Sequence, residues 1–203
     1  MTTVMLNERT ALDVIYHRRA VRAYKPEPIN ERRLRALFEA AVHAPTAMHH
    51  EPWQFLVVQN RRVLKRLSDR AKEIASAEAA HHGNLLKRPG AAGDGIPTPL
   101  ADPEFNIFYD AGTLVVICAK ASNPFVTADC WLAAENFMLA ACADGLGTCC
   151  IGFAVAALNT PEIKAELGIP ADVEAIAPMI VGVPAGETAP VPRKPPVVLN
   201  WVR

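Results

Sequence analysis

The chain has 203 residues, of which 51% are hydrophobic and 21% are charged, a composition typical of a globular protein with one sizeable core. Its 21 basic and 21 acidic residues leave a formal net charge of zero, which disfavours nucleic acid or an anionic membrane surface as a partner. No apolar run reaches the length of a membrane span and no signal-peptide pattern occupies the start, so we expect a cytoplasmic protein with no membrane partner.

The first predicted element is a helix that starts at a capping box, with Thr10 as the oxygen-bearing cap and Asp13 as the acid three residues later. A basic cluster at residues 17–24 (HRRAVRAY) follows, and we expect it in the last turn of this helix. Cations there interact favourably with the helix dipole, which is the structural explanation of the cluster. The alternative is an anion site, because arginine is suited to bidentate recognition of phosphate.

Two further helices, a strand and a long loop are expected before residue 104. Asn30 caps a helix whose apolar residues recur at helical spacing, and Pro45 ends it. Residues 53–58 (WQFLVV) are typical of a strand, and another helix begins at about Arg62. Residues 83–103 contain four glycines and four prolines, which predicts a loop that acts as a lid or a substrate channel.

The second half of the chain contains the most apolar segments. Residues 113–119 predict a buried strand, and residues 127–144 predict a central helix that is apolar on nearly every side and that Gly145 ends. A short helix begins at Thr160-Pro161 and closes at Gly168, in the usual arrangement of proline inside the start and glycine past the end.

The C-terminal part is expected to leave the core. Residues 175–183 predict the last core strand, and from residue 184 the chain is rich in proline and therefore extended. This arm, residues 184–203, ends in the apolar run 197–202 (VVLNWV), which we expect to be buried in the neighbouring subunit of a dimer. No internal repeat or second domain is visible, so residues 1–203 are expected to form a single domain.

The cysteines and histidines do not form a recognisable metal or disulfide pattern. There is no C-x-x-C pair, and the histidine doublets at 49–50 and 81–82 lack the i, i+4 spacing of ligands on a helix, so we expect no metal site. The number of cysteines is odd and most lie in apolar segments, so we interpret them as buried, unreactive thiols. They are Cys118, Cys130, Cys142, Cys149 and Cys150.

Four segments, in order and across almost the whole chain, together resemble the FMN-dependent nitroreductase family. They are residues 18–24 (RRAVRAY), 44–55 (APTAMHHEPWQF), 135–153 (ENFMLAACADGLGTCCIGF) and 191–196 (VPRKPP), the last with Trp201 close behind. The resemblance implies an α+β, three-layer fold with a central mixed, mostly antiparallel sheet flanked by helices. It also implies an intertwined homodimer with an exchanged C-terminal arm and FMN at the interface.

The resemblance also implies the cofactor site. Arg18 and Lys194 would bind the FMN phosphate, with Arg193 as a helper, and Arg22 would lie nearer the flavin ring. The backbone N–H groups near Gly152 and Phe153 would bond flavin N5 and O4, and Thr46 and Ala47 would line the FMN of the other subunit. The full set of expected cofactor residues is Arg18, Arg19, Ala20, Arg22, Pro45, Thr46, Ala47, His49, Asn136, Cys150, Ile151, Gly152, Phe153, Arg193 and Lys194.

The expected activity is that of an FMN-dependent NAD(P)H oxidoreductase that reduces nitroaromatic, quinone or similar small aromatic acceptors by ping-pong hydride transfer. No catalytic side chain is required, since the flavin carries the chemistry. The chain departs from the family at Ala20, His49, Glu51 and Cys150, where relatives have serine, asparagine, glutamine, and often tryptophan or proline. The alternatives are therefore a flavin-binding or storage dimer without turnover, or a specialised member that acts on flavin itself or on halogenated aromatics.

Overall fold

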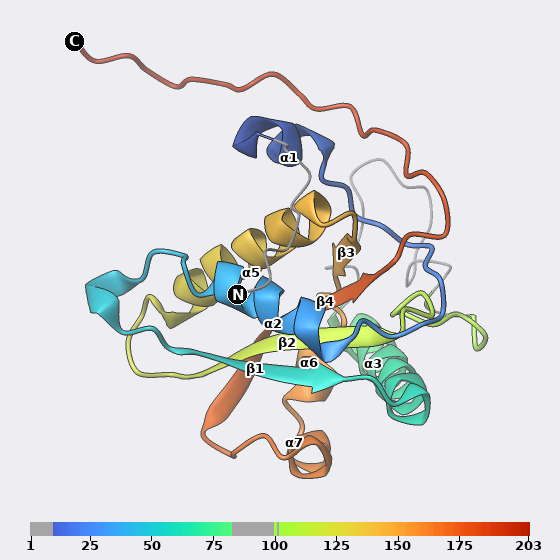
Figure 1. The fold of residues 1–203 in the computed structure, drawn as a ribbon. Coiled ribbons are helices and arrows are strands. Elements are labelled where there is room, and N and C mark those ends of the chain that lie inside the picture. Colours follow the sequence, from blue (N-terminus) through green and yellow to red (C-terminus); the bar gives the residue numbers. More distant parts are fainter. Residues whose placement is uncertain (1–9, 83–99, 101) are drawn as a thin grey trace.

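The computed structural model describes residues 10–82, 100 and 102–203 (Figure 1). A central sheet is covered by helices on both faces. The elements are α1 (Ala11–His17), α2 (Glu31–Ala41), the short 3-10 helix η1 (Ala47–His49), β1 (Trp53–Val58), α3 (Arg61–His82), β2 (Thr113–Lys120), α5 (Val126–Ala143), β3 (Gly147–Cys150), α6 (Ala154–Leu158), α7 (Pro161–Leu167) and β4 (Val173–Gly182).

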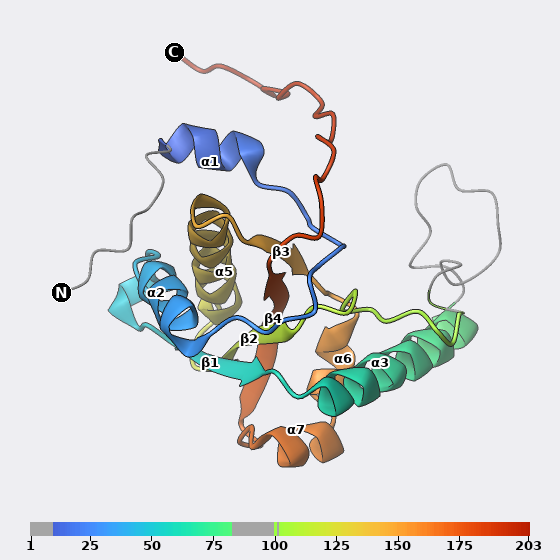
Figure 2. The ribbon, with the colours of Figure 1, turned by 45° about the vertical axis from the view of Figure 1, so that its right-hand side comes forward.

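The four strands form one sheet in the order β1-β2-β4-β3, and every neighbouring pair is antiparallel. Side chains along a strand point alternately to the two faces, and β2 shows this clearly. Its Leu114 and Val116 pack in a core cluster with α3 and α6, whereas its Val115 and Ile117 pack in a second cluster with α2 and α5. Figure 2 shows the three layers that result. The predicted α+β fold is confirmed.

The helix ends follow the capping residues that the sequence contains. Thr10 forms the predicted capping box with Asp13, and Asn30 accepts a hydrogen bond from the Arg33 N–H. Thr160 caps α7, with Pro161 in the first turn and Gly168 in the left-handed conformation at the end. The prediction of Pro45 as the end of the second helix was wrong, because α2 already ends at Ala41.

The arginines of the basic cluster lie outside the first helix, contrary to our prediction, and only His17 is in its last turn. Helix α1 ends at His17, and Arg18 already has extended backbone angles. From there the chain runs beside β3 and β4, where Val21 N–H donates to Thr148 O at 3.0 Å and Lys25 N–H donates to Val183 O at 2.8 Å. The cluster is therefore positioned by the sheet rather than by the helix dipole.

Two glycines permit this close approach of the N-terminal segment to the sheet. A Cβ atom on Gly147 would lie 2.6 Å from the Val21 side chain, and a Cβ atom on Gly182 would lie 2.7 Å from the Tyr24 ring. Neither ring nor branched side chain can retreat easily, because Val21 and Tyr24 are both buried. A single isolated parallel bridge, between Ala20 and Thr148, is the only parallel pairing in the described part of the chain.

Two elements were not predicted from the sequence. They are strand β3, residues 147–150, and the short helix α6. Helix α5 is confirmed and is apolar on nearly every side, and within one protomer its Trp131 and Leu132 are 38% and 46% exposed.

The C-terminal arm has no regular structure, and residues 185–203 are all exposed. Figure 1 shows the arm leaving the body of the molecule after β4. Most of the predicted loop, residues 83–99 and 101, lies outside the described residues. All five cysteines are free thiols. Across the described ranges, we find no helix with both the length and the apolar character that crossing a membrane would require.

Candidate functional site

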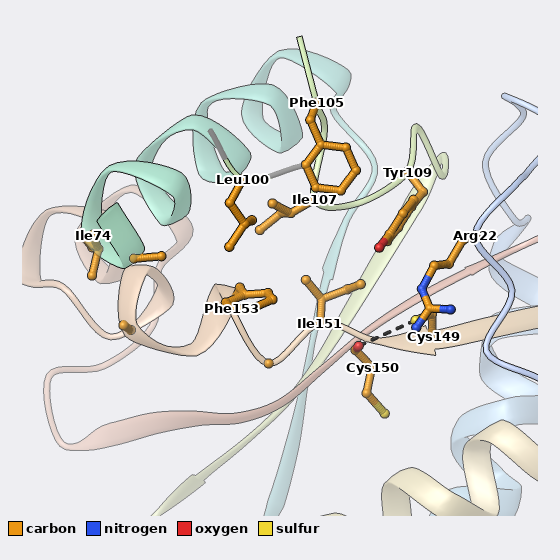
Figure 3. A pocket seen from close by; sticks show the side chains of 13 residues that line it. Arg22, Ile74, Leu100, Phe105, Ile107, Tyr109, Cys149, Cys150, Ile151 and Phe153 are labelled. Carbon is orange, nitrogen blue, oxygen red and sulfur yellow. Dashed lines mark hydrogen bonds between the residues drawn. The ribbon is translucent and has the colours of Figure 1, made fainter. Parts of the chain in front are cut away.

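A cavity of about 570 Å³ lies beside the end of β3, between the second half of α3 and the start of α6 (Figure 3). Its wall is mostly apolar and aromatic, and Arg22 is the only charged side chain among the described residues that line it. These described residues are Arg22, Ile74, Ala75, Leu100, Phe105, Ile107, Tyr109, Cys149, Cys150, Ile151, Gly152, Phe153 and Ala156. Such a cavity suits a flat, largely apolar ligand with a polar edge.

One wall of the cavity is the turn that joins β3 to α6. The Ile151 N–H is held by Pro178 O at 2.9 Å, which fixes the start of the turn against β4. The backbone N–H groups of Gly152 and Phe153 take part in no hydrogen bond within the described residues. A Cβ atom added to Gly152 would meet no atom within 4 Å. The turn therefore offers two free backbone donors beside open space.

Arg22 places a positive charge at one end of the cavity. The Arg22 guanidinium lies over the Tyr109 ring, 5.8 Å from its centroid, in a cation–π contact. Figure 3 shows Arg22, Tyr109 and Cys149 together at one end of the cavity. Tyr109 itself has a left-handed backbone with φ of 50°, which is unusual for an aromatic residue and indicates that its surroundings hold it in place.

The two cysteines of the cavity are protonated near neutral pH. Burial raises the pKa of the Cys150 thiol to about 11, with a further increase from neighbouring Cys149 and a smaller opposing effect of Arg18. Burial also raises the pKa of the Cys149 thiol, and the Arg22 and Arg18 guanidiniums oppose this shift. Because thiolates are the reactive form, neither cysteine has the environment of a nucleophile.

Arg18 and Arg19 lie a few residues before Arg22 in the chain, but they do not line the cavity. Arg18 Nε lies 3.3 Å from the Glu135 carboxylate of α5, with the Arg18 side chain 23% exposed. Arg19 Nη1 donates to the carbonyl oxygens of Tyr16 and Arg18 at 2.6 and 3.0 Å. Ala20 is tied to Thr148 by its β-bridge.

The predicted residues 45–49 lie elsewhere on the protomer, at the junction of α2 and β1, where Figure 1 places η1 away from β3. Met48 and His49 both have φ of 54°, and Glu51 has φ of 44°. The Ala47 N–H donates to Asp129 Oδ1 at 3.1 Å. Asp129 is buried, and its Oδ2 is the only buried side-chain oxygen or nitrogen without a hydrogen-bond partner in the described part of the chain.

The other predicted residues are also separate from the cavity. Asn136 Nδ2 donates to Ala40 O at 3.3 Å, which ties α5 to α2. Arg193 and Lys194 are exposed on the C-terminal arm. Within one protomer, the structure therefore brings together Arg22 and residues 150–153, and leaves Pro45, Thr46, Ala47, His49 and the arm cations apart from them.

Sequence reasoning missed the aromatic side of the cavity. Phe105 and Tyr109 contact each other edge-to-face, with ring centroids 5.4 Å apart, and Ile107 lies between them in sequence. Leu100 closes the same wall, at the end of the segment that we predicted to be a lid or channel. The available signal was the return of large apolar residues directly after the loop rich in glycine and proline.

Comparison with known proteins gives the family. Residues 15–186 match the model of the nitroreductase family. A protein of Archaeoglobus fulgidus, whose name describes an NADH dehydrogenase/NAD(P)H nitroreductase, is 29% identical over 177 residues, which are 87% of this chain and 86% of that protein.

Solved structures show the same fold. A nitroreductase with bound FMN from Bacteroides fragilis is 27% identical, with a TM-score of 0.73 over 96% of this chain and 98% of its own. An iodotyrosine deiodinase bound to FMN and 3-iodo-L-tyrosine has a TM-score of 0.75 over 95% and 100% of the two chains, but its 20% identity supports only the fold. The resemblance drawn from the four sequence segments is confirmed, and this chain belongs to the nitroreductase family.

Proposed function

We propose that this chain is an FMN-dependent oxidoreductase that takes reducing equivalents from NAD(P)H and passes them to small aromatic acceptors such as nitroaromatics or quinones. The family match, the FMN-bound neighbours and the NAD(P)H nitroreductase relatives support it. The observation that carries the proposal is the cavity lined by Arg22, by aromatic side chains, and by Gly152 and Phe153, whose backbone N–H groups make no hydrogen bond among the described residues.

The residues of the cavity fit FMN. The isoalloxazine is flat and apolar on its faces, which suits walls formed by Phe105, Tyr109 and Phe153. Its polar edge needs donors, and the N–H groups of Gly152 and Phe153 are free to supply them. The absence of a side chain at Gly152 leaves room for a ligand to approach the backbone. When bound, FMN supplies the hydride chemistry.

The basic residues would then divide the charges of the cofactor between them. Arg22, which lines the cavity, would stabilise negative charge on the reduced ring. Arg18, with Arg19 and the exposed arm residues Arg193 and Lys194, would hold the phosphate. Charge-assisted hydrogen bonds from arginine suit a phosphate that carries nearly two negative charges.

The complete site needs two copies of the chain. Residues 45–49 and the arm lie apart from the cavity of their own protomer, so a partner would have to supply them. Large exposed apolar side chains are available to bury in such a homodimer: Leu12, Ile15 and Tyr16 on α1, Trp131 and Leu132 on α5, and Val197, Val198, Leu199, Trp201 and Val202 on the arm. We propose that the arms are exchanged between protomers.

The chain's own residues would mainly bind, orient and exclude water. The aromatic walls would stack an acceptor against the cofactor, and Arg22 would attract an acceptor oxygen that gains negative charge. Both cavity thiols stay protonated and take no part in the reaction, because burial raises their pKa values.

The test is the spectrum of the purified full-length protein. A flavin band at about 450 nm that disappears on anaerobic addition of NADH or NADPH, and returns with a quinone, is the expected result for a flavin oxidoreductase. A flavin band that no reductant bleaches would support a binding or storage protein instead. A colourless protein that fails to take up added FMN would refute the proposal. Sedimentation analysis of the full chain against a variant lacking the arm tests the exchange, which predicts that only the full chain is a stable dimer.

A further inference from the structure

Lys72 of α3 is a buried lysine with an unusual set of partners. Its side chain is 10% exposed, and Nζ donates to the carbonyl oxygens of Pro103 and Phe105, both at 2.8 Å, and approaches that of Asp102 at 3.3 Å. An ammonium group has three protons to donate, so three backbone carbonyls can satisfy it. Among the described ion pairs, Lys72 Nζ lies farther, at 3.5 Å, from a carboxylate oxygen of Asp69. The main partners of Lys72 are therefore backbone atoms of one segment.

Ser68 holds the same segment one helical turn earlier. Its side chain is fully buried, and its Oγ accepts a hydrogen bond from the Ile107 N–H at 3.0 Å. Ser68 and Lys72 are four residues apart and so share one face of α3. Together they fix the backbone of residues 102–107 at two points. Contacts with backbone atoms set the path of a segment whatever side chains it carries.

The segment held in this way forms the aromatic wall of the cavity. Phe105 and Ile107 line the cavity, and Phe105 contacts Tyr109, which in turn lies under Arg22. Lys72 is thus connected to the charged end of the cavity through a continuous series of contacts. Figure 3 shows Phe105, Ile107 and Tyr109 facing the cavity, opposite Phe153.

We propose that Lys72 and Ser68 are positioning residues that fix the aromatic wall and so determine which acceptors fit beside the cofactor. The inference rests on the proposed function, since it concerns the acceptor space of the same cavity. If the wall moves away, a large flat acceptor loses its stacking contact, whereas a small one depends less on it. The expected effect is therefore on the KM for large acceptors, with little effect on cofactor binding or on the reaction with NAD(P)H.

The test compares FMN-loaded full-length enzymes. Lys72→Met keeps most of the side-chain volume and removes the donors, and Ser68→Ala removes the acceptor for the Ile107 N–H. Lys65→Met is the matched control, because Lys65 is on the same helix but exposed and paired with Asp69. We expect Lys72→Met to raise the KM for a naphthoquinone about tenfold relative to that for p-benzoquinone, since poorer pocket contacts cost about that much. Ser68→Ala should act in the same direction, and Lys65→Met should change neither KM.

Hydrogen exchange gives a readout that does not depend on activity. Exchange at residues 105–109 should become faster in Lys72→Met and Ser68→Ala but not in Lys65→Met, because the backbone contacts of α3 are lost. Loss of FMN or an equal decrease in kcat with both quinones would indicate a merely structural role and overturn the proposal. So would an unchanged KM ratio in folded, FMN-loaded variants. If the unsubstituted protein shows no turnover, the proposed function fails instead, and the exchange rates alone decide whether Lys72 holds the wall.

Discussion

Replacing Arg18 by alanine tests the assignment of the phosphate-binding cation. Arg18 Nε lies 3.3 Å from Glu135 Oε1, and the two side chains are 23% and 46% exposed. A partly exposed ion pair of this kind contributes less than about 1 kcal/mol to stability, so Arg18→Ala should fold normally. A charge-assisted hydrogen bond to the phosphate is worth about 1.5–3 kcal/mol, so its loss should raise the Kd for FMN roughly 10- to 150-fold.

Glu135 provides a second variant with the opposite expectation. The Glu135 carboxylate forms an ion pair with the Arg18 guanidinium and adds negative charge where we place the phosphate. Glu135→Gln removes that charge and releases Arg18, so FMN should bind as tightly as before or more tightly. Arg35→Ala is the control, because Arg35 forms only an exposed i, i+4 pair with Glu31 on α2.

The assay is a titration of the apoprotein with FMN at low and at high salt, in which binding is monitored by the quenching of flavin fluorescence. The loss of affinity in Arg18→Ala should be larger at low salt, because salt screens exposed charges. If Arg18→Ala binds FMN as tightly as Arg35→Ala does at both salt concentrations, Arg18 does not contact the phosphate and the assignment is wrong.

Three further predictions follow from the glycines and thiols of the site. Gly147→Ala should lower the free energy of unfolding by about 1–3 kcal/mol in urea titrations, because its Cβ would lie 2.6 Å from Val21. An unchanged urea midpoint would show that the N-terminal segment does not lie on the sheet here. Gly152→Ala should keep its melting temperature but bind FMN more weakly, since its Cβ would meet open space where the cofactor is proposed to lie; equal FMN affinity would place the cofactor elsewhere. Burial raises the pKa of Cys150 to about 11, so its labelling by iodoacetamide in the apoprotein should increase about tenfold per pH unit from pH 7 to 10, and mass-spectrometric mapping that shows a plateau near pH 8 would contradict this.

The elements that the sequence predicted well are those determined by local interactions. The caps at Thr10, Asn30 and Thr160 act within one helical turn, and β1 and β2 consist of residues that suit a strand anywhere. Strand β3 was missed because Gly-Thr-Cys-Cys has little strand preference of its own. It is a strand because Thr148 and Cys149 pair with Val181 and Ile180 of β4, more than thirty residues later in the chain.

The basic cluster was placed wrongly for the same reason, because a contact between distant parts of the chain determines its position. Its charges predicted the last turn of a helix, but the bond from Val21 N–H to Thr148 O draws the segment onto the sheet edge. That contact spans most of the chain, and no local pattern can reveal it. The close approach at Gly147 was visible only as a glycine in the sequence.

The part of the candidate site that belongs to family motifs was named from the sequence, whereas the part that depends on tertiary packing was not. Arg22 and residues 150–153, which the resemblance implies as cofactor residues, line the cavity, and their contact with FMN stays a prediction. The place of Phe105, Ile107 and Tyr109 in the cavity was not predicted, because it depends on backbone contacts with Ser68 and Lys72. No local sequence pattern indicates those contacts. The return of large apolar residues after the loop rich in glycine and proline is the nearest signal in the sequence.

The loop after α2 combines two unfavourable features that the fold alone does not require. Met48, His49 and Glu51 all have left-handed backbone angles, which are unfavourable for residues other than glycine and cost on the order of 1 kcal/mol each. Asp129 is buried with one oxygen on the Ala47 N–H and the other without a hydrogen bond among the described residues, which adds a desolvation cost. Neither feature contributes to the cavity of the same protomer, because residues 45–49 do not line it. The strain in this loop has an explanation if the loop contributes to a site on another copy of the chain. The same loop contains the residues that, by the family resemblance, would line the cofactor of the other subunit. The proposed dimer therefore explains both the cavity that one protomer leaves incomplete and the strained loop that it does not use.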